Sequence, residues 1–402
     1  MKPGRNRVPL PPGFGTIWAA VVIDLIGFGI VLPILPIYAK RYHTTSFEAA
    51  MLVAAFSAAT FVCSPLWGRV SDRFGRKPVL LVSLAGTAVG SLVTGLAGGL
   101  GLLLIGRVID GASGASVSVA QAAAADLSRT GDRSRLFGYL GAAFGIGFVV
   151  GPAIGALGAL GGPRLPFFIA AAIAGANTLV AWRRLPETRP AGGPSGPGRT
   201  GPVASLSGGR AAVPLLAVAF SAMVAFSGFE ATFALFGQRR FGFGISSAAA
   251  VFTAVGAVIV LVQGGLVHPV VGRLGEARTL LVGLIANAGG LALLAAAHSW
   301  SVAAPALLAL TVGQGLVQTT MVTALVTRTE PSRRGQALGA QQSAGALARV
   351  VGPAAGGALL GAHASGDPYV LGAALTAAAV VLAGAALKVG RKHPEPDAKT
   401  LR

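Results

Sequence analysis

Five ionisable side chains stand inside long apolar stretches of this 402-residue sequence. They are Asp24, Arg107, Asp110, Glu230 and Arg349. A charge at the centre of a hydrocarbon layer costs about 2.5 to 3.5 kcal/mol on insertion scales, so each needs a partner or a task. A carboxylate that an arginine approaches and leaves will lose and regain a proton. These five residues are therefore the first candidates for chemistry.

Asp24 has the clearest position for proton transfer. It lies ten residues into an apolar run that begins at position 14. At 1.5 Å per helical residue this is about 15 Å, near the middle of a membrane. If Arg107 approached in one conformation and withdrew in another, Asp24 would release and take up a proton. The alternative is a static ion pair between two helices. Asp110, three residues after Arg107 on nearly the same helix face, competes for that arginine, and we leave both pairings open.

Glu230 lies among aromatic residues, with Phe226, Phe229 and Phe233 close in sequence. A carboxylate beside aromatic rings suits a cavity for cations or for proton coupling. The alternative is an acid that reaches the outer membrane interface near Arg239.

Several other polar residues are substrate candidates. Arg349 would balance an acid or an anionic substrate. Gln121, Gln314 and Gln318 would offer hydrogen bonds to substrate, and the last two share a helix face by their spacing of four. The alternative for all three glutamines is that they simply join neighbouring helices.

The composition indicates which elements must hold these residues. Hydrophobic residues make up 53% of the chain, charged residues only 11%, and the mean hydropathy is +0.71. Soluble domains carry about 25% charged residues, and one membrane span needs about 20 apolar residues. We predict an all-α integral membrane protein whose twelve transmembrane helices lie near 14–38, 48–67, 78–97, 100–125, 136–158, 164–183, 212–237, 247–270, 278–297, 301–326, 336–361 and 368–388.

The net charge of +19 predicts an orientation and not a nucleic-acid partner. The basic residues form short clusters between apolar runs, not one continuous stripe. With the amino terminus inside, the inner segments carry 25 Lys and Arg and the outer loops 5. This asymmetry predicts that both termini are cytoplasmic. The first run carries Asp24 and two prolines and has no obvious cleavage site, so we expect a retained helix. The single cysteine, Cys63, excludes a disulfide framework.

The two halves of the chain repeat a glycine and proline pattern at a fixed offset. Residues Gly138, Gly151, Pro152 and Gly155 recur 201 positions later as Gly339, Gly352, Pro353 and Gly356. Repeated six-helix halves are typical of transporters that rock one half against the other around a central site. The stretch from Pro186 to Gly209 is rich in Gly, Pro, Ser and Arg and predicts a flexible linker. We therefore predict six-helix bundles at 1–185 and 211–390, a cytoplasmic linker at 186–210 and a cytoplasmic tail at 391–402.

The segment from Gly68 to Pro78 combines one carboxylate with four cations in what we expect to be a tight glycine-rich turn. Such groups can lock helix ends together by charge-assisted hydrogen bonds that break when the helices separate. For Arg76 and Lys77 taken alone, the simpler interpretation is positive charge on the inner side. We name as gating candidates Gly68, Asp72, Arg73, Gly75, Arg76 and, from the inner end of the fourth helix, Asp126.

The predicted fifth helix carries glycines at a spacing of four, at Gly147, Gly151 and Gly155. This spacing permits close contact between helix backbones. Pro152 removes one helical hydrogen bond and favours a bend. Together these residues predict a tight hinge or seal between two helices.

Four segments resemble motifs of the major facilitator superfamily. Residues 68–78 closely resemble its signature loop, and 106–115, with Arg107, resemble its arginine-bearing motif in helix four. Residues 147–155 resemble the motif typical of its drug exporters, and 24–36 resemble the opening of tetracycline-type proton antiporters. The resemblance is strong to about Pro186 and weaker afterwards, where the signature loop is shortened to 272–278.

The resemblance implies a proton antiporter of the bacterial cytoplasmic membrane that exports drug-like or natural-product molecules by alternating access. It also implies that the helix-one acid Asp24 and the helix-four arginine Arg107 take part in coupling, with Glu230 as a second acid. The expected partners are a small-molecule substrate, protons and the lipid bilayer, with a monomer as the default state.

Three other functions are alternatives to export. A proton-coupled importer of a small nutrient would use the same fold. A membrane-embedded enzyme would need a nucleophile, a base or metal ligands near an interface, and the sequence shows no such constellation. A non-transporting sensor would need a signalling domain that the linker is too short to supply. The five scattered histidines form no metal-ligand cluster, and no nucleotide-binding glycine loop is present, so we expect neither a metal nor another cofactor besides the proton gradient.

Overall fold

The computed structural model describes residues 10–127, 133–188, 213–329, 334–362 and 366–389. Within these ranges the regular structure is helical. The helices before the predicted linker are α1 (Phe14–Val31), α2 (Leu35–Ala39), the 3-10 turn η1 (Lys40–Tyr42), α3 (Ser46–Phe74), α4 (Arg76–Leu96), α5 (Leu100–Ala112), α6 (Ser116–Leu127), α7 (Arg133–Leu160) and α8 (Leu165–Arg184). Those after it are α9 (Val213–Phe241), α10 (Ile245–Leu261), the π-helical turn η3 (Val262–Leu266), α11 (Val267–Leu274), α12 (Glu276–Ala295), α13 (Trp300–Thr327), α14 (Arg334–Ala362) and α15 (Asp367–Val389).

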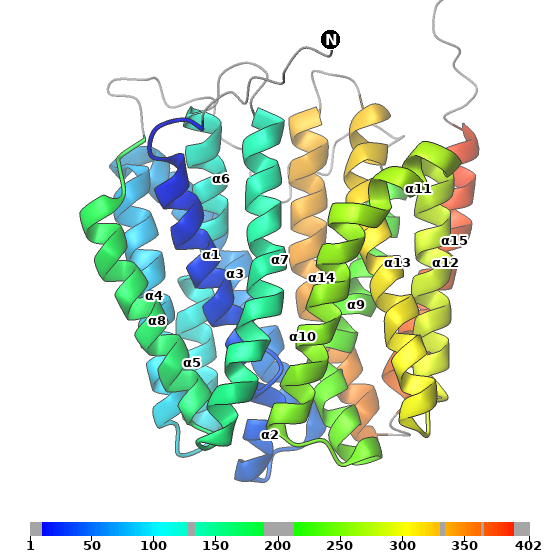
Figure 1. Cartoon of the computed structure of the whole chain (residues 1–402), viewed down its shortest axis with the longest axis horizontal. Helices are drawn as coiled ribbons and strands as arrows, with labels where there is room; N and C mark the ends of the chain where they lie inside the picture. Colours follow the sequence, from blue (N-terminus) through cyan, green and yellow to red (C-terminus); the bar gives the residue numbers. More distant parts are fainter. Residues whose placement is uncertain (1–9, 128–132, 189–212, 330–333, 363–365, 390–402) are drawn as a thin grey trace, which may run out of the picture.

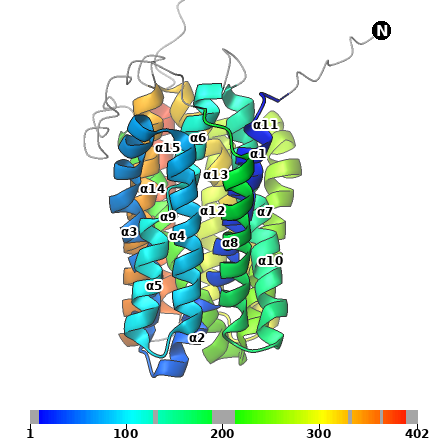
Figure 2. The same cartoon turned by 90° about the vertical axis from the view of Figure 1, so that its left-hand side faces the viewer.

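Twelve of these helical segments are long and apolar enough to cross a membrane, so the chain is an all-α multi-pass membrane protein with twelve spans, as predicted. The spans stand side by side as a bundle (Figures 1 and 2). We call the end of the bundle at which α1 begins the upper end, and the end at which α2 lies the lower end, as in Figure 1. The predicted linker and tail fall almost entirely outside the described residues, and the predicted domain boundaries stay a prediction.

Three spans differ from the continuous helices predicted by the sequence. The first is interrupted between Val31 and Leu35, around Pro33, because proline cannot donate to the helical ladder. The fourth is interrupted between α5 and α6, and the eighth contains the π-turn η3.

The helix predicted at 48–67 instead continues to Phe74, so most of the expected glycine-rich turn is helical. The turn itself is confined to Gly75, whose φ of 104° favours glycine.

The interruption of the fourth span takes three carbonyl groups out of regular helical bonding. Side chains of two neighbouring spans bind them, in addition to short turn bonds from the N–H groups of Gly114 and Ala115. Thr60 Oγ1 donates to the Gly111 carbonyl at 3.0 Å, and Trp67 Nε1 donates to the Ala112 carbonyl at 2.6 Å. Ser83 Oγ donates to the carbonyl of Ser113 and accepts from the backbone N–H of Ala115. In the bilayer core such groups have no water to bind, so these three donors make the interruption possible.

The glycines of the fifth span let α7 lie directly against α1. A Cβ at position 151 would lie 2.7 Å from the Cα of Gly29, and one at position 147 would lie 2.7 Å from the Cβ of Leu25. The second copy of the repeated glycine pattern makes an equivalent helix contact in the second half. Gly352 of α14 faces α9, where a Cβ would lie 2.8 Å from the backbone nitrogen of Gly228. Each half of the sequence therefore packs its fifth span on its first through glycine.

Helices from the two halves of the sequence meet at the lower end. An apolar cluster there combines Ile34, Tyr38 and Leu52 with Leu235 and Leu360. α7 and α10 are also in close backbone contact, as shown by the position of Gly256, where an added Cβ would overlap the carbonyl of Phe148. Figure 1 shows α7 and the α10–α11 span close together below and diverging toward the upper end.

We expect Gly151→Ala to destabilise the protein, because the added methyl would overlap the α1 backbone. Neither α1 nor α7 can shift to relieve this overlap without moving the other helix. Overpacking of this kind costs about 1 to 3 kcal/mol. Gly141→Ala, on the same helix with no atom within 4 Å of its Cβ position, is the matched control. Thermal unfolding of the purified protein in detergent measures both. Equal melting temperatures for the two variants would contradict the close α1–α7 contact.

Candidate functional site

Asp24 lies in α1 opposite the interruption of the fourth span. The hydroxyl of Ser116, the first residue of α6, donates to Asp24 Oδ2 at 2.5 Å. Thr87 of α4 lies beside both this carboxyl and that of Asp110. Asp24 Oδ1 is buried and has no hydrogen-bond partner in the described part of the chain. The positive end of the α6 dipole also faces the carboxyl, because the helix begins at Ser116.

The structure separates the two pairings that the sequence left open. Arg107 Nη1 lies 2.9 Å from Asp110 Oδ2, and Arg107 Nη2 donates to Thr94 Oγ1 at 3.1 Å. Both members of this pair are almost fully buried, at 2% and 4% exposed. In this conformation Arg107 therefore belongs to Asp110, and Asp24 binds a hydroxyl instead of a cation. A carboxyl with one free oxygen and no cation can hold a proton with little reorganisation.

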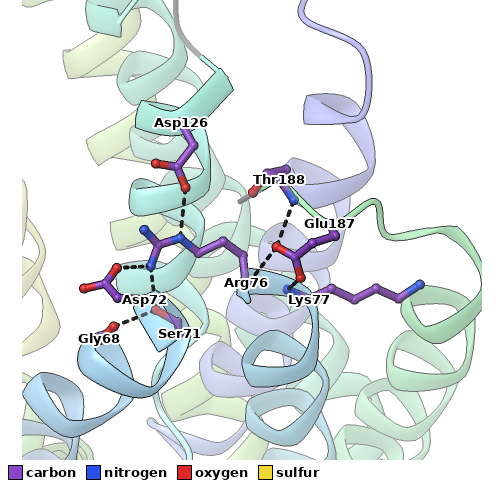
Figure 3. Close-up of polar contacts among 8 residues, drawn as sticks. All are labelled: Gly68, Ser71, Asp72, Arg76, Lys77, Asp126, Glu187 and Thr188. Carbon is purple, nitrogen blue, oxygen red and sulfur yellow. Dashed lines mark hydrogen bonds and ion pairs between the residues drawn. The ribbon is translucent and has the colours of Figure 1, made fainter. Parts of the chain in front are cut away.

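A second cluster, at the upper end, joins α3, α4 and α6 (Figure 3). We call Gly68, Ser71, Asp72, Arg76 and Asp126 the signature cluster. Arg76 stands at its centre, with Nη1 at 2.6 Å from Asp72 Oδ1 and Nε at 2.9 Å from Asp126 Oδ2. Arg76 Nη1 also donates to Ser71 Oγ, which donates to the Gly68 carbonyl. Arg76 is 8% exposed, so it is an organising residue of the cluster and more than a surface cation. Arg73 of the predicted set lies instead with its guanidinium 5.3 Å from the ring of Phe74.

Glu187 completes this cluster and was missed by sequence reasoning. Its carboxylate accepts from the backbone N–H groups of Arg76 at 2.8 Å and Lys77 at 3.1 Å, and so caps the start of α4 (Figure 3). A Cβ at Gly75 would lie 2.4 Å from Glu187 Oε2. A carboxylate at a helix N-terminus is favourable, but its partner lies 111 residues away in sequence. No local pattern could have identified it.

Glu230 lies on α9 near Arg349 of α14, which acts on its carboxyl electrostatically without forming an ion pair in the described residues. The flanking rings of Phe226, Phe229 and Phe233 are buried in one aromatic cluster of the second half. Arg239, the partner that the alternative interpretation offered to Glu230, binds elsewhere.

The glutamine candidates separate into different environments. Gln314 is buried, and its Oε1 accepts from Asn287 Nδ2 at 3.0 Å, so it joins α13 to α12 as the structural alternative predicted. Gln318 is exposed and accepts from Gln263 Nε2 of the π-turn at 3.0 Å. Gln121 is half-buried on α6.

Arg239 links the two halves of the sequence at the lower end. Its Nη2 donates to Ser46 Oγ, at the start of α3, at 2.5 Å, and its Nη1 donates to the Leu360 carbonyl of α14 at 2.8 Å. Lys40 lies nearby, and burial together with the charge of Arg239 lowers the pKa of its ammonium group. With the apolar cluster around Ile34 and Leu235, this contact closes the lower end.

Comparisons with known proteins agree with this architecture. The family model of the Major Facilitator Superfamily matches residues 17–274 and 265–402. Tetracycline resistance protein, class G, of Vibrio anguillarum is 34% identical over 367 residues, which cover 88% of this chain and 93% of the relative. Multidrug resistance protein 2 of Bacillus subtilis (strain 168) is 31% identical over 277 residues, covering 67% and 69%. The crystal structure of the human organic anion transporter MFSD10 (TETRAN) superposes with a TM-score of 0.71 at 24% identity, covering 93% and 100%.

We expect Gly75→Ala to destabilise the protein more than Gly275→Ala. Both glycines precede a span with positive φ, 104° and 76°, and extended ψ, so both substitutions carry the strain of that conformation, about 1 to 3 kcal/mol. Only the alanine at 75 also collides with Glu187, because no atom lies within 4 Å of a Cβ at 275. Melting temperatures of the two variants in detergent give the difference. A Glu187→Ala change should reduce the excess cost of Gly75→Ala, and purely additive effects would contradict the contact.

We expect Arg239→Gln to loosen the lower end, because it removes the charged donor shared by Ser46 and Leu360. Spin labels on the lower ends of α3 and α14 would then report a larger population of long distances by pulsed electron paramagnetic resonance. Arg240→Gln is the matched control, because Arg240 instead lies with its guanidinium 5.9 Å from the ring of Phe236. Identical distance distributions for wild type and Arg239→Gln would show that the contact does not hold the end closed.

Proposed function

The chain belongs to the Major Facilitator Superfamily and is a transporter, not an enzyme, and we propose that it exports drug-like small molecules in exchange for protons. The relatives named for tetracycline and multidrug resistance support export of such molecules. The bacterial relatives support a place in the bacterial cytoplasmic membrane. We orient the upper end toward the cytoplasm, because in sequence the segments that join the spans at that end carry most of the Lys and Arg.

The environment of Asp24 is the observation on which proton coupling rests. Its carboxyl has one oxygen held by Ser116 and one buried oxygen without a partner, and it faces the broken part of the fourth span. Broken helices near the middle of the membrane are where secondary transporters bind ions and substrate. A proton on Oδ1 would neutralise the carboxyl, and its release would leave a negative charge that repels Asp110 and competes with it for Arg107. Protonation of Asp24 would thereby change how α1 packs on α6.

The closed lower end supports a cycle of alternating access. In the proposed cycle, substrate binds from the cytoplasm while Arg239 and the apolar cluster keep the outer end shut. Loss of the proton from Asp24 and rocking of one half against the other, with each half held together by its glycine contacts, would open the outer end. The signature cluster would then hold the cytoplasmic end together, with Arg76 joining Asp72 to Asp126.

We expect Asp24→Asn to abolish proton-driven export. In everted membrane vesicles energised by respiration, the wild type should accumulate tetracycline and lose it on addition of an uncoupler. Asp24→Asn should accumulate at least tenfold less, and Ser116→Ala should fall between them. Glu48→Gln is the control, since glutamine preserves the capping box at the start of α3.

Three outcomes would count against the proposal. Undiminished accumulation by Asp24→Asn would move the coupling role to Glu230 or Asp110. Accumulation insensitive to the uncoupler would exclude proton coupling. Proton-driven uptake into intact cells would make the chain an importer.

A further inference from the structure

We propose that a cavity at the upper end of the second half, lined by α11, α12, α13 and the π-turn η3, binds an organic cation that carries N–H groups, as a loading site for the transported molecule. The inference rests on the proposed export function and adds a site to it. The cavity measures about 290 Å³, and its lining residues are Gln263, His268, Glu276, Thr319, Thr320 and Thr323, with Val267 and Val271.

The cavity occupies a place that the repeat makes comparable with the signature cluster. Gly75 and Gly275 share an extended ψ of 161° and a positive φ, and each donates its N–H to the carbonyl four residues earlier. Each is followed at once by the first residue of a span, Arg76 in one half and Glu276 in the other. In the first half a guanidinium fills the space with two ion pairs. In the second half the charge is reversed and a cavity remains.

Glu276 is available to a ligand. It is half-buried at the start of α12 and forms no ion pair in the described part of the chain. Its neighbours in sequence, Arg273 and Arg278, are exposed and make no ion pair with it. The positive end of α12 favours this carboxylate, and the cavity beside it leaves room for a positively charged ligand to pair with it.

Apart from His268, whose imidazole can both donate and accept, the other polar residues of the wall offer hydrogen-bond acceptors. The hydroxyls of Thr319, Thr320 and Thr323 each donate to the carbonyl four residues earlier, at 3.1, 2.7 and 3.3 Å. Their donors are therefore used and their oxygen lone pairs remain. Gln263 Nε2 likewise donates to Gln318, which leaves Gln263 Oε1 free to accept. An acceptor-rich wall with one carboxylate matches a ligand that carries both positive charge and N–H groups.

The π-turn η3 borders the cavity through Gln263. A π-turn inserts one residue and widens the helix, and such turns are frequent at functional sites. Gly264 and Gly265 of the same turn are exposed and lie outside the cavity lining. Substrate arriving from the cytoplasm would meet the cavity before the centre of the membrane.

Equilibrium binding of two fluorescent or radiolabelled cations to the purified full-length protein tests this site. Ethidium carries a permanent charge and aromatic amino groups, whereas tetraphenylphosphonium carries charge without N–H donors. We expect Glu276→Gln to weaken ethidium binding about tenfold and Thr323→Val to weaken it severalfold, with a smaller effect on tetraphenylphosphonium. Asp367→Asn is the matched control, because Asp367 is also a half-buried carboxylate at the start of a span, but at the lower end. Unchanged ethidium affinity in Glu276→Gln, an equal loss in Asp367→Asn, or no ethidium binding by the wild type would overturn the site.

A chemical measurement keeps the test independent of ligand affinity and of folding defects. In a Cys63→Ala background, Thr323→Cys should react faster with a methanethiosulfonate carrying ammonium than with one carrying sulfonate, and Glu276→Gln should remove that preference. Thr327→Cys, one turn further along α13 and outside the cavity lining, is the control. Equal preferences at both positions would overturn the inference. Because neither measurement uses a proton gradient, a failed export assay with these results intact would reject the proposed function and leave the binding site standing.

Discussion

Inside the bilayer every polar group must find its partner within the protein, because hydrocarbon offers none. The described structure meets this requirement where the fourth span is broken. Thr60, Trp67 and Ser83 satisfy three carbonyl groups that a continuous helix would have used. The break then allows Ser116 to begin a new helix beside Asp24. The most costly charges of the first half, Arg107 and Asp110, neutralise each other one turn away.

A second requirement is that the two halves move relative to each other without unfolding, and close helix packing within each half meets it. Glycine contacts of α7 with α1, and of α14 with α9, bring helix backbones together within each half. Contacts between the halves at the lower end combine apolar residues with the Arg239 contact. Tight packing within each half, with the halves joined toward the lower end and diverging above it, is the arrangement that a rocking motion needs.

Much of the fold could be predicted because it depends on local properties. The length of each apolar run determines the spans, and the glycine spacing around Gly151 identified a close helix contact. The interruption between α5 and α6 could not be predicted, because Ser113, Gly114 and Ala115 are compatible with a helix and their partners lie on other spans. Hydropathy does not predict the continuation of α3 to Phe74, because its last two turns carry the charged residues Arg69, Asp72 and Arg73 and lie outside the apolar run.

The candidate site shows the same division. Residue type, spacing and the family resemblance together singled out Asp24, Arg107, Asp110 and the acidic and basic members of the signature cluster as candidates. Which of these side chains pair with one another was not predictable, since that depends on which of them come together in the folded helices. Glu187 and the cavity around Glu276 were invisible, because each is formed by segments far apart in sequence.

Proton release on drug binding tests most directly whether Asp24 couples protons to transport. Tetracycline would be added to the purified protein in weakly buffered detergent solution while a pH indicator and a binding signal are followed together. The proposed mechanism predicts that the wild type releases protons as the drug binds and that Asp24→Asn binds the drug without that release. Equal proton release by both proteins, or drug binding to the wild type with no release, would contradict it.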